Sequence, residues 1–401
     1  MKYLIVLLLG ICAACGQKKE TTTTVQSGAP VETEPANTNY KPAFEGQTRI
    51  AGVKTQTPIA HKIVTEKLSN PWGMALLPEG RLLVTQKGGT MVIVSADGKV
   101  SEEITGLPKV DDRGQGGLLD VVLDPDFESN RTIYWTFSEP QKGGNLTAVG
   151  KGVLSADEKS VTRVSVIFRA TPVYDGKLHY GSRLAFDRSG NLFVSTGERS
   201  DLETRPQAQD LKSGLGKIFR ITKDGQPAPG NPKFNSPSMP GIYSLGHRNP
   251  QGLALHPETG DLWQNEFGPM GGDELNLIKP GKNYGWPTIT YGVEYSGDAI
   301  SNKATQKEGL EQPVYYWDPV LSPSGMAFYT GDAIPEWKNN LFIGGLSSNH
   351  ICRLVIENNK VVGEERLLPD LGQRFRDISM SADGGLYAIT DGGKLYWIGK
   401  K

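Results

Sequence analysis

The chain has 401 residues, among them 49 glycines, 26 prolines and three cysteines. Its 43 basic and 44 acidic side chains leave a formal net charge of −1, so it lacks the basic surface that binds nucleic acid. Three cysteines exclude a disulfide framework. Charged residues at 22% and hydrophobic residues at 37% are typical of a globular protein rather than a disordered one. The many glycines, often paired with Asp, predict tight turns between short strands.

Residues 1–15 have the pattern of a lipoprotein-type signal peptide. Lys2 precedes an apolar run from Leu4 to Ile11, and small residues stand directly before Cys15. Cleavage there would leave Cys15 as the lipidated first residue of an exported protein, periplasmic or at the cell surface, whose membrane contact is this anchor. The alternative is a soluble secreted protein that is cleaved near the same place.

Residues 16–50 are predicted to be a disordered tether, because Thr, Pro, Glu, Gly and Asn dominate and no apolar periodicity is present. Residues 51–401 are predicted to form a single folded domain. If Cys15 carries lipid, Cys352 remains as a lone thiol in that domain.

The folded domain contains six loose copies of one pattern. Each copy opens with an apolar strand, passes a turn containing Pro, Asp or Gly, and continues with a second strand rich in aromatic and β-branched residues. The first strands begin near Gly73, Gly117, Ser182, Gly252, Gly325 and Ile378. Six units of three or four strands predict an all-β protein, a six-bladed β-propeller of four-stranded antiparallel blades. A two-sheet sandwich, the alternative, does not require six similar units.

The chain ends on the third strand of its last unit. Residues 61–66 alternate like a strand and could supply the missing outer strand of that unit. Such pairing would close the ring and leave no exposed edge.

Polar side chains stand just before several of the innermost strands. These strands run in one direction around the central channel of a propeller, so the residues that precede them meet at one mouth of the channel. The positions hold Gln115, His179, Arg248, Asn249, Arg374, Phe375 and Arg376. Convergent polar groups predict a binding pocket, and several arginines favour a small polycarboxylate or phosphate ligand.

His179 is the histidine that stands directly at this mouth. An imidazole that is neutral near pH 7 suits proton abstraction from a hydroxyl, so we expect His179 to be a general base. The alternative is a neutral residue that only forms hydrogen bonds. His61, His256 and His350 are expected to be structural or at the surface, and His247 to support its neighbour Arg248.

Residues 265–274 form an acidic, glycine-rich segment. Gly and Pro turns direct backbone carbonyls outward, and Asp273 and Glu274 add carboxylates. Oxygen ligands without His or Cys favour Ca²⁺ over zinc. The alternative is a capped loop without a metal.

Seven motifs taken together resemble one known family. They lie at residues 114–120, 245–252 (LGHRNPQG), 266–274, 281–287 (GKNYGWP), 291–297 (YGVEYSG), 324–329 and 372–377. The chain is similar there to the glucose/sorbosone dehydrogenases, above all to the bacterial aldose sugar dehydrogenases that depend on pyrroloquinoline quinone (PQQ). The resemblance extends over about residues 60–400 and implies the same six-bladed propeller.

The resemblance also implies a reaction and a cofactor. His179 would take the proton from the anomeric hydroxyl of an aldose while the C1 hydride passes to the quinone C5, so that the sugar becomes a lactone. Arg248 would polarise the C5 carbonyl. The electron acceptor that reoxidises the cofactor stays unknown. The residues that would hold the quinone are Gln115, Arg248, Asn249, Tyr295, Ser296, Gly297, Gly345, Arg374, Phe375 and Arg376.

Calcium is implied in the same way. The carbonyls of Gly268 and Pro269 would bind a calcium ion that the quinone chelates. Glu274 and the carbonyl of Tyr284 would bind a second ion.

Two positions depart from the family pattern. Leu178 replaces the acidic residue that precedes the histidine in the soluble glucose dehydrogenases, and Gly345 stands where the aldose enzymes tend to have Ala. The loops also look short, which predicts an open site with broad aldose use. Two other functions remain open: a calcium-dependent propeller lactonase, which would need acidic ligands at the channel centre, and a non-enzymatic binding propeller.

Overall fold

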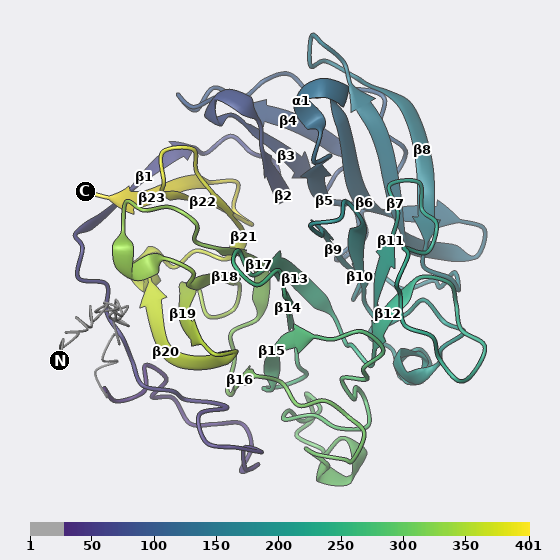
Figure 1. Cartoon of the computed structure of the whole chain (residues 1–401), viewed down its shortest axis with the longest axis vertical. Helices are drawn as coiled ribbons and strands as arrows, with labels where there is room; N and C mark the ends of the chain where they lie inside the picture. The colour runs from purple at the N-terminus through teal and green to yellow at the C-terminus, as the bar shows by residue number, and fades with distance from the viewer. Residues whose placement is uncertain (1–27) are drawn as a thin grey trace, which may run out of the picture.

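Six β-sheets surround a central channel in the computed structural model, which describes residues 28–401 (Figure 1). The predicted six-bladed propeller is confirmed. The predicted signal peptide, Cys15 and the first part of the predicted tether lie outside the described residues. Among residues 28–401, no helix has the length and apolar character needed to cross a bilayer.

The innermost strands form a closed ring in which each strand lies beside the innermost strand of the next blade. The first three blades, from the inner to the outer strand, are β2 (Pro71–Leu76), β3 (Leu82–Gln86) and β4 (Thr90–Val94); β5 (Leu118–Leu123), β6 (Thr132–Gln141), β7 (Gly144–Leu154) and β8 (Val161–Arg169); and β9 (Gly181–Phe186), β10 (Leu192–Thr196), β11 (Lys217–Ile221) and β12 (Ile242–Leu245). The other three are β13 (Pro250–Leu255), β14 (Leu262–Glu266), β15 (Asp273–Ile278) and β16 (Tyr315–Trp317); β17 (Pro323–Phe328), β18 (Leu341–Gly345), β19 (Ile351–Glu357) and β20 (Lys360–Leu367); and β21 (Phe375–Met380), β22 (Leu386–Thr390), β23 (Leu395–Lys400) and β1 (Ile59–Thr65).

Helices are short and lie between the strands. They are α1 (Phe127–Asn130) and the 3₁₀ turns η1 (Pro78–Gly80), η2 (Arg205–Gln209), η3 (Ser301–Lys303), η4 (Pro335–Trp337) and η5 (Pro369–Leu371).

Burial explains why the inner strands are so easily read from the sequence. All five side chains of β3 and of β10 are buried, because neighbouring blades cover both faces of these strands. The outer strand β8 is exposed over much of its length and carries polar residues. Hydrophobic side chains between adjacent blades supply the core; one cluster joins Leu83 of the first blade to Trp135 of the second.

The ring closes as predicted. β1, from the start of the folded part, pairs antiparallel with the last strand β23, so that His61 lies opposite Ile398. The first blade has three strands, and two isolated bridges, Met91 to Ile104 and Val94 to Val100, take the place of a fourth.

Residues 28–58 run along the outside of the propeller, and we call them the strap. The backbone amides of Asn37 and Thr38 donate to the carboxylate of Asp318 at 2.7 and 3.2 Å. Gln47 is fully buried and donates to the carbonyl of Pro313 at 2.9 Å. The strap includes residues 28–50 of the predicted tether, and the domain boundary at residue 50 stays a prediction.

Candidate active site

His179 lies at one mouth of the channel, two residues before β9. Its side chain is buried, and its backbone has a φ of +47°, a left-handed conformation that non-glycine residues rarely adopt. Its backbone N–H donates to Oε1 of Gln115 at 2.8 Å. Its ring Nδ1 lies 2.6 Å from Oε1 of Glu198, which is fully buried beyond the end of β10.

The Glu198 contact decides which ring nitrogen of His179 is free. An ionised carboxylate only accepts hydrogen bonds, so Nδ1 carries the proton and Nε2 keeps its lone pair. Burial lowers the pKa of His179 below its usual 6.5, the nearby Arg248 lowers it further, and Glu198 opposes both effects. The ring is therefore neutral at pH 7 and can accept a proton at Nε2.

Arg248 and Asn249 lie beside this pair, just before β13. The Arg248 guanidinium donates to the carbonyls of Phe267 and Gly268 and lies over the Trp286 ring, 5.2 Å from its centroid. Asn249 accepts from the backbone N–H of Gly181 at 3.1 Å.

Nε of Arg248, Nδ2 of Asn249 and Nε1 of Trp286 are buried donors without a partner among residues 28–401. A buried donor without an acceptor costs about 1–3 kcal/mol. These atoms therefore fit a ligand rich in acceptor oxygens.

Arg374 and Arg376 share one carboxylate. Nε of Arg374 and Nε of Arg376 donate to Asp391 at 2.9 and 2.7 Å, and Arg376 also donates to Oε1 of Gln251 at 3.0 Å. Arg376 in turn lowers the pKa of Lys87, after the larger effect of burial, so a further cation lies near. The arginines are thus partly neutralised by Asp391, and Asp112 is a second carboxylate near Lys87.

Phe375 differs from its two neighbours because its side chain is fully buried in the core of the last blades. Its carbonyl accepts from the Ser324 hydroxyl at 2.7 Å. Any contact of Phe375 with a cofactor would therefore be made by its backbone.

Tyr295, Ser296 and Gly297 form an exposed turn, and Tyr295 is 75% exposed. The turn is fixed through its neighbour Glu294, which pairs with Arg205. Gly345 ends β18, and a Cβ there would lie only 2.1 Å from the hydroxyl of Ser348. The structure thus keeps this position small, and a direct contact of these residues with a cofactor stays a prediction.

The predicted calcium loop is tightly folded. The N–H of Gly268 donates to Oδ1 of Asp273 at 2.8 Å, while its carbonyl accepts from Arg248. The other oxygen of Asp273 accepts from the backbone of Leu321 and Ser322. Asp273 therefore braces the loop, and its two oxygens are already used. Pro269 packs against Gly292: a Cβ added at Gly292 would lie 2.7 Å from the ring of Pro269.

Glu274 borders a cavity of about 10 Å³, room for one water-sized particle. Glu266 lines the same cavity, and burial followed by repulsion from Glu266 raises the pKa of Glu274. A divalent cation would neutralise this pair of carboxylates, so the residues fit a metal ion. Tyr284 stacks on His247, which bonds to Glu266 at 2.9 Å. Within residues 28–401, no group of three or more His, Cys, Asp or Glu side chains has metal-binding geometry, so backbone oxygens would have to complete the site.

Comparison with known proteins identifies the family. A family model described as glucose/sorbosone dehydrogenase matches residues 68–397. The chain belongs to the glucose/sorbosone dehydrogenase family. The aldose sugar dehydrogenase YliI of Escherichia coli is 43% identical over 334 residues, which are 82% of this chain and 89% of that protein.

Solved structures agree with this family. The soluble aldose sugar dehydrogenase of Escherichia coli in its apo form matches with a TM-score of 0.82 and 42% identity, covering 86% of this chain and all of that one. The PQQ-bound aldose sugar dehydrogenase of Streptomyces coelicolor matches with a TM-score of 0.70 and 30% identity, covering 86% of this chain and 99% of that one.

Four charged residues of this family member were not predicted from the sequence, and all four share one place in the blade. They end or follow a second strand: Lys87 after β3, Glu198 after β10, Glu266 at the end of β14 and Asp391 after β22. Second strands run antiparallel to the innermost ones, so their ends return to the same mouth. The pairs His179–Glu198 and His247–Glu266 are even equally spaced in sequence. That repeat is the signal that could have found Glu198.

The channel of this family member also holds carboxylates that the sequence reasoning did not place there. Arg183 of β9 pairs with Asp120 of β5 at 2.9 Å and with Asp377 of β21 at 3.0 Å. It also lies over Trp72 of β2, 4.4 Å from the ring centroid. Acidic side chains therefore do face the channel, but an arginine occupies the position between them.

Proposed function

We propose that this protein is a PQQ- and calcium-dependent aldose sugar dehydrogenase that oxidises the anomeric carbon of aldoses to lactones. The observation that carries the proposal is the buried His179–Glu198 pair, whose free Nε2 lies at the mouth beside Arg248. The family membership and the aldose sugar dehydrogenases among its relatives support the same reaction class.

In this reaction His179 is the base. Its Nε2 accepts the proton of the anomeric hydroxyl, and the imidazolium that forms is stabilised by Glu198 at 2.6 Å from Nδ1. The carboxylate also fixes the orientation of the ring, as the acidic member of a catalytic triad does. Leu178 adds no charge beside the histidine, so selectivity for one sugar does not arise from that position.

The cofactor would lie against the unpartnered donors. Arg248 and Asn249 offer Nε and Nδ2 to its oxygens, and Arg374 and Arg376 offer positive charge to its carboxylates. Gln115 completes this set. When bound, PQQ would supply the acceptor for the C1 hydride, and calcium would supply a Lewis acid.

Calcium would use the oxygens of the acidic loop. The carbonyl of Gly268 lies against Arg248 and, with that of Pro269, would bind one ion. Glu274, which borders the small cavity, and the carbonyl of Tyr284 would hold a second ion. The like-charged Glu266 and Glu274 are the observation that supports a cation there.

The test is reconstitution. The purified apoprotein is given PQQ with Ca²⁺, and dye reduction is followed with a panel of aldoses, with PQQ omitted in one control and EDTA added in another. We expect reduction with several aldoses that depends on both additions. Reduction of no sugar contradicts the proposal. Calcium-dependent hydrolysis of a sugar lactone without PQQ would instead show the lactonase, and quinone-independent binding alone would show a binding propeller.

We also propose that the protein is exported and anchored through Cys15. The composition of residues 1–15 supports this. Metabolic labelling with a fatty acid should label the wild type and not Cys15→Ser, and equal labelling of both contradicts the anchor.

A further inference from the structure

Arg199 is a buried cation directly after Glu198. It is 1% exposed, and its guanidinium donates hydrogen bonds only to neutral oxygens. Burial lowers the pKa of Arg199. Removing a charged group from water costs several kcal/mol unless good contacts compensate for it. The contacts of the Arg199 guanidinium must therefore compensate for this cost.

The guanidinium holds the segment that leads into His179. Its Nε donates to the carbonyl of Leu178 at 3.1 Å, and Nη2 donates to the carbonyl of Gly176 at 2.6 Å. It also lies over the ring of Tyr180, 4.1 Å from the centroid. Arg199 thus contacts residues on both sides of His179.

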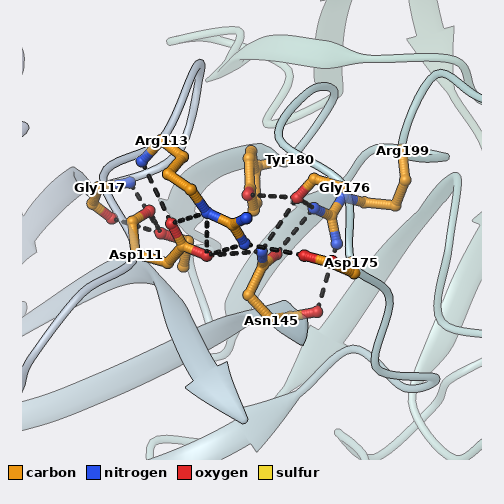
Figure 2. Close-up of polar contacts among 9 residues, drawn as sticks. Asp111, Arg113, Gly117, Asn145, Asp175, Gly176, Tyr180 and Arg199 are labelled. Carbon is orange, nitrogen blue, oxygen red and sulfur yellow. Dashed lines mark hydrogen bonds and ion pairs between the residues drawn. The ribbon is translucent and has the colours of Figure 1, made fainter. Parts of the chain in front are cut away.

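The carbonyl of Gly176 is the centre of this network (Figure 2). Besides Arg199 it accepts from Nδ2 of Asn145 at 2.9 Å and from the Tyr180 hydroxyl at 3.0 Å. Asn145 is a fully buried residue of β7, and Nδ2 also donates to Asp111 at 2.9 Å. The segment before His179 is thereby tied to the neighbouring blade.

The backbone at His179 needs such support. His179, with φ +47°, is followed by Gly181 and Ser182 at +65° and +81°, and Arg199 itself has φ +75°. A left-handed conformation costs a non-glycine residue about 1–2 kcal/mol. It persists where the surroundings determine it, which is typical of functional sites.

We propose that Arg199 is a positioning residue for sugar oxidation: it fixes the carbonyls of Gly176 and Leu178 and so keeps the His179 imidazole against Glu198. The proposal rests on the proposed function, because it takes His179 as the base. The charges that face the ring agree with this arrangement: Arg248 and Arg199 both favour the neutral imidazole, and Glu198 opposes them.

Arg199→Gln and Arg199→Lys test the proposal, with Arg113→Gln as the matched control. Arg113 belongs to the same network in Figure 2, but its side chain is 55% exposed and its guanidinium pairs with the side chains of Asp111 and Asp175. Sugar kinetics are measured with PQQ and Ca²⁺ bound, and quinone affinity is titrated separately. Hydrogen exchange at residues 177–180 is measured in the apoprotein.

We expect Arg199→Gln to lower kcat about 10- to 100-fold, as a misplaced catalytic group does, with the sugar KM and quinone affinity changed less than about threefold. Arg199→Lys keeps the charge but has one nitrogen for two carbonyls. Its kcat should therefore lie between that of the wild type and that of Arg199→Gln. Exchange at residues 177–180 should accelerate in Arg199→Gln and not in Arg113→Gln.

Equal kcat in Arg199→Gln and Arg113→Gln overturns the proposal, and so does a quinone affinity that falls as far as kcat. Unchanged exchange at residues 177–180 overturns it without any reference to activity. An inactive wild type with accelerated exchange in the variant would instead contradict the proposed function and leave the positioning role supported. Should Arg199→Gln not fold, Arg199→Lys is read in the same way.

Discussion

The Glu198→Gln substitution isolates the charge that orients His179. The contact is 2.6 Å long, and both residues are buried, so it is a charge-assisted hydrogen bond shielded from water. Such bonds contribute about 1.5–3 kcal/mol, which corresponds to about 10- to 150-fold in rate if the contribution is made in the transition state. The amide keeps the size of the side chain and can still accept from the N–H of Ser200, as Glu198 does at 3.1 Å.

We therefore expect kcat to fall about 10- to 150-fold with quinone binding retained. The pH profile gives a second, independent readout. His179 must be neutral to act, so activity is lost as pH falls through its pKa, and that acid limb already lies below pH 6.5 in the wild type because burial lowers the pKa. Glu198 raises this pKa, so its loss must move the acid limb to still lower pH.

The assay is kcat/KM for one aldose between pH 4.5 and about 8, the range in which histidine titrates. Glu203→Gln is the control, because Glu203 is an exposed carboxylate of the same segment. An acid limb that moves to higher pH, or a kcat equal to that of the control, refutes the role of Glu198.

Three further predictions concern the metal, the strap and acid stability. Glu274→Gln should raise the Ca²⁺ concentration needed for thermal stabilisation of the apoprotein, and an unchanged calcium titration by scanning fluorimetry contradicts the site. Asp318→Ala removes the acceptor for the amides of Asn37 and Thr38, so hydrogen exchange there should accelerate and unfolding free energy should fall by about 1–3 kcal/mol; protected amides contradict the strap contact. Burial lowers the pKa of His350 from 6.5 to about 4. Between these two values the unfolded state binds a proton that the folded state does not bind, so the free energy of unfolding decreases as the pH falls. Between pH 7.5 and pH 4, the free energy of unfolding measured in urea should decrease by about 3 kcal/mol less in His350→Gln than in the wild type. Parallel pH curves for the two proteins contradict this prediction.

The inner part of each blade could be predicted from the sequence, because strands covered on both faces read as continuous apolar runs. Strands β3 and β10 are of this kind. The closing strand was predictable for another reason, since a last unit of three strands needs a partner for its edge. Short outer strands such as β12 and β16, with four and three residues, give too little periodicity to be recognised.

The site was predictable only on its inner side. The residues before innermost strands follow from the topology of a propeller, and the structure brings Gln115, His179, Arg248 and Asn249 together. Carboxylates such as Glu198 and Asp391 were missed, because their partners depend on how second strands return to the mouth and not on a local motif. Asp391 bonds to both Arg374 and Arg376, which the sequence had suggested as ligands of an anion.

The most direct test of the account is stopped-flow reduction of bound PQQ by an excess of aldose in the wild type and in His179→Ala, both loaded with calcium. The account predicts equal quinone binding and a reduction rate that falls about 10²- to 10⁴-fold in the variant, the contribution expected of a general base. A reduction rate equal to that of the wild type would contradict the claim that His179 takes the proton from the sugar.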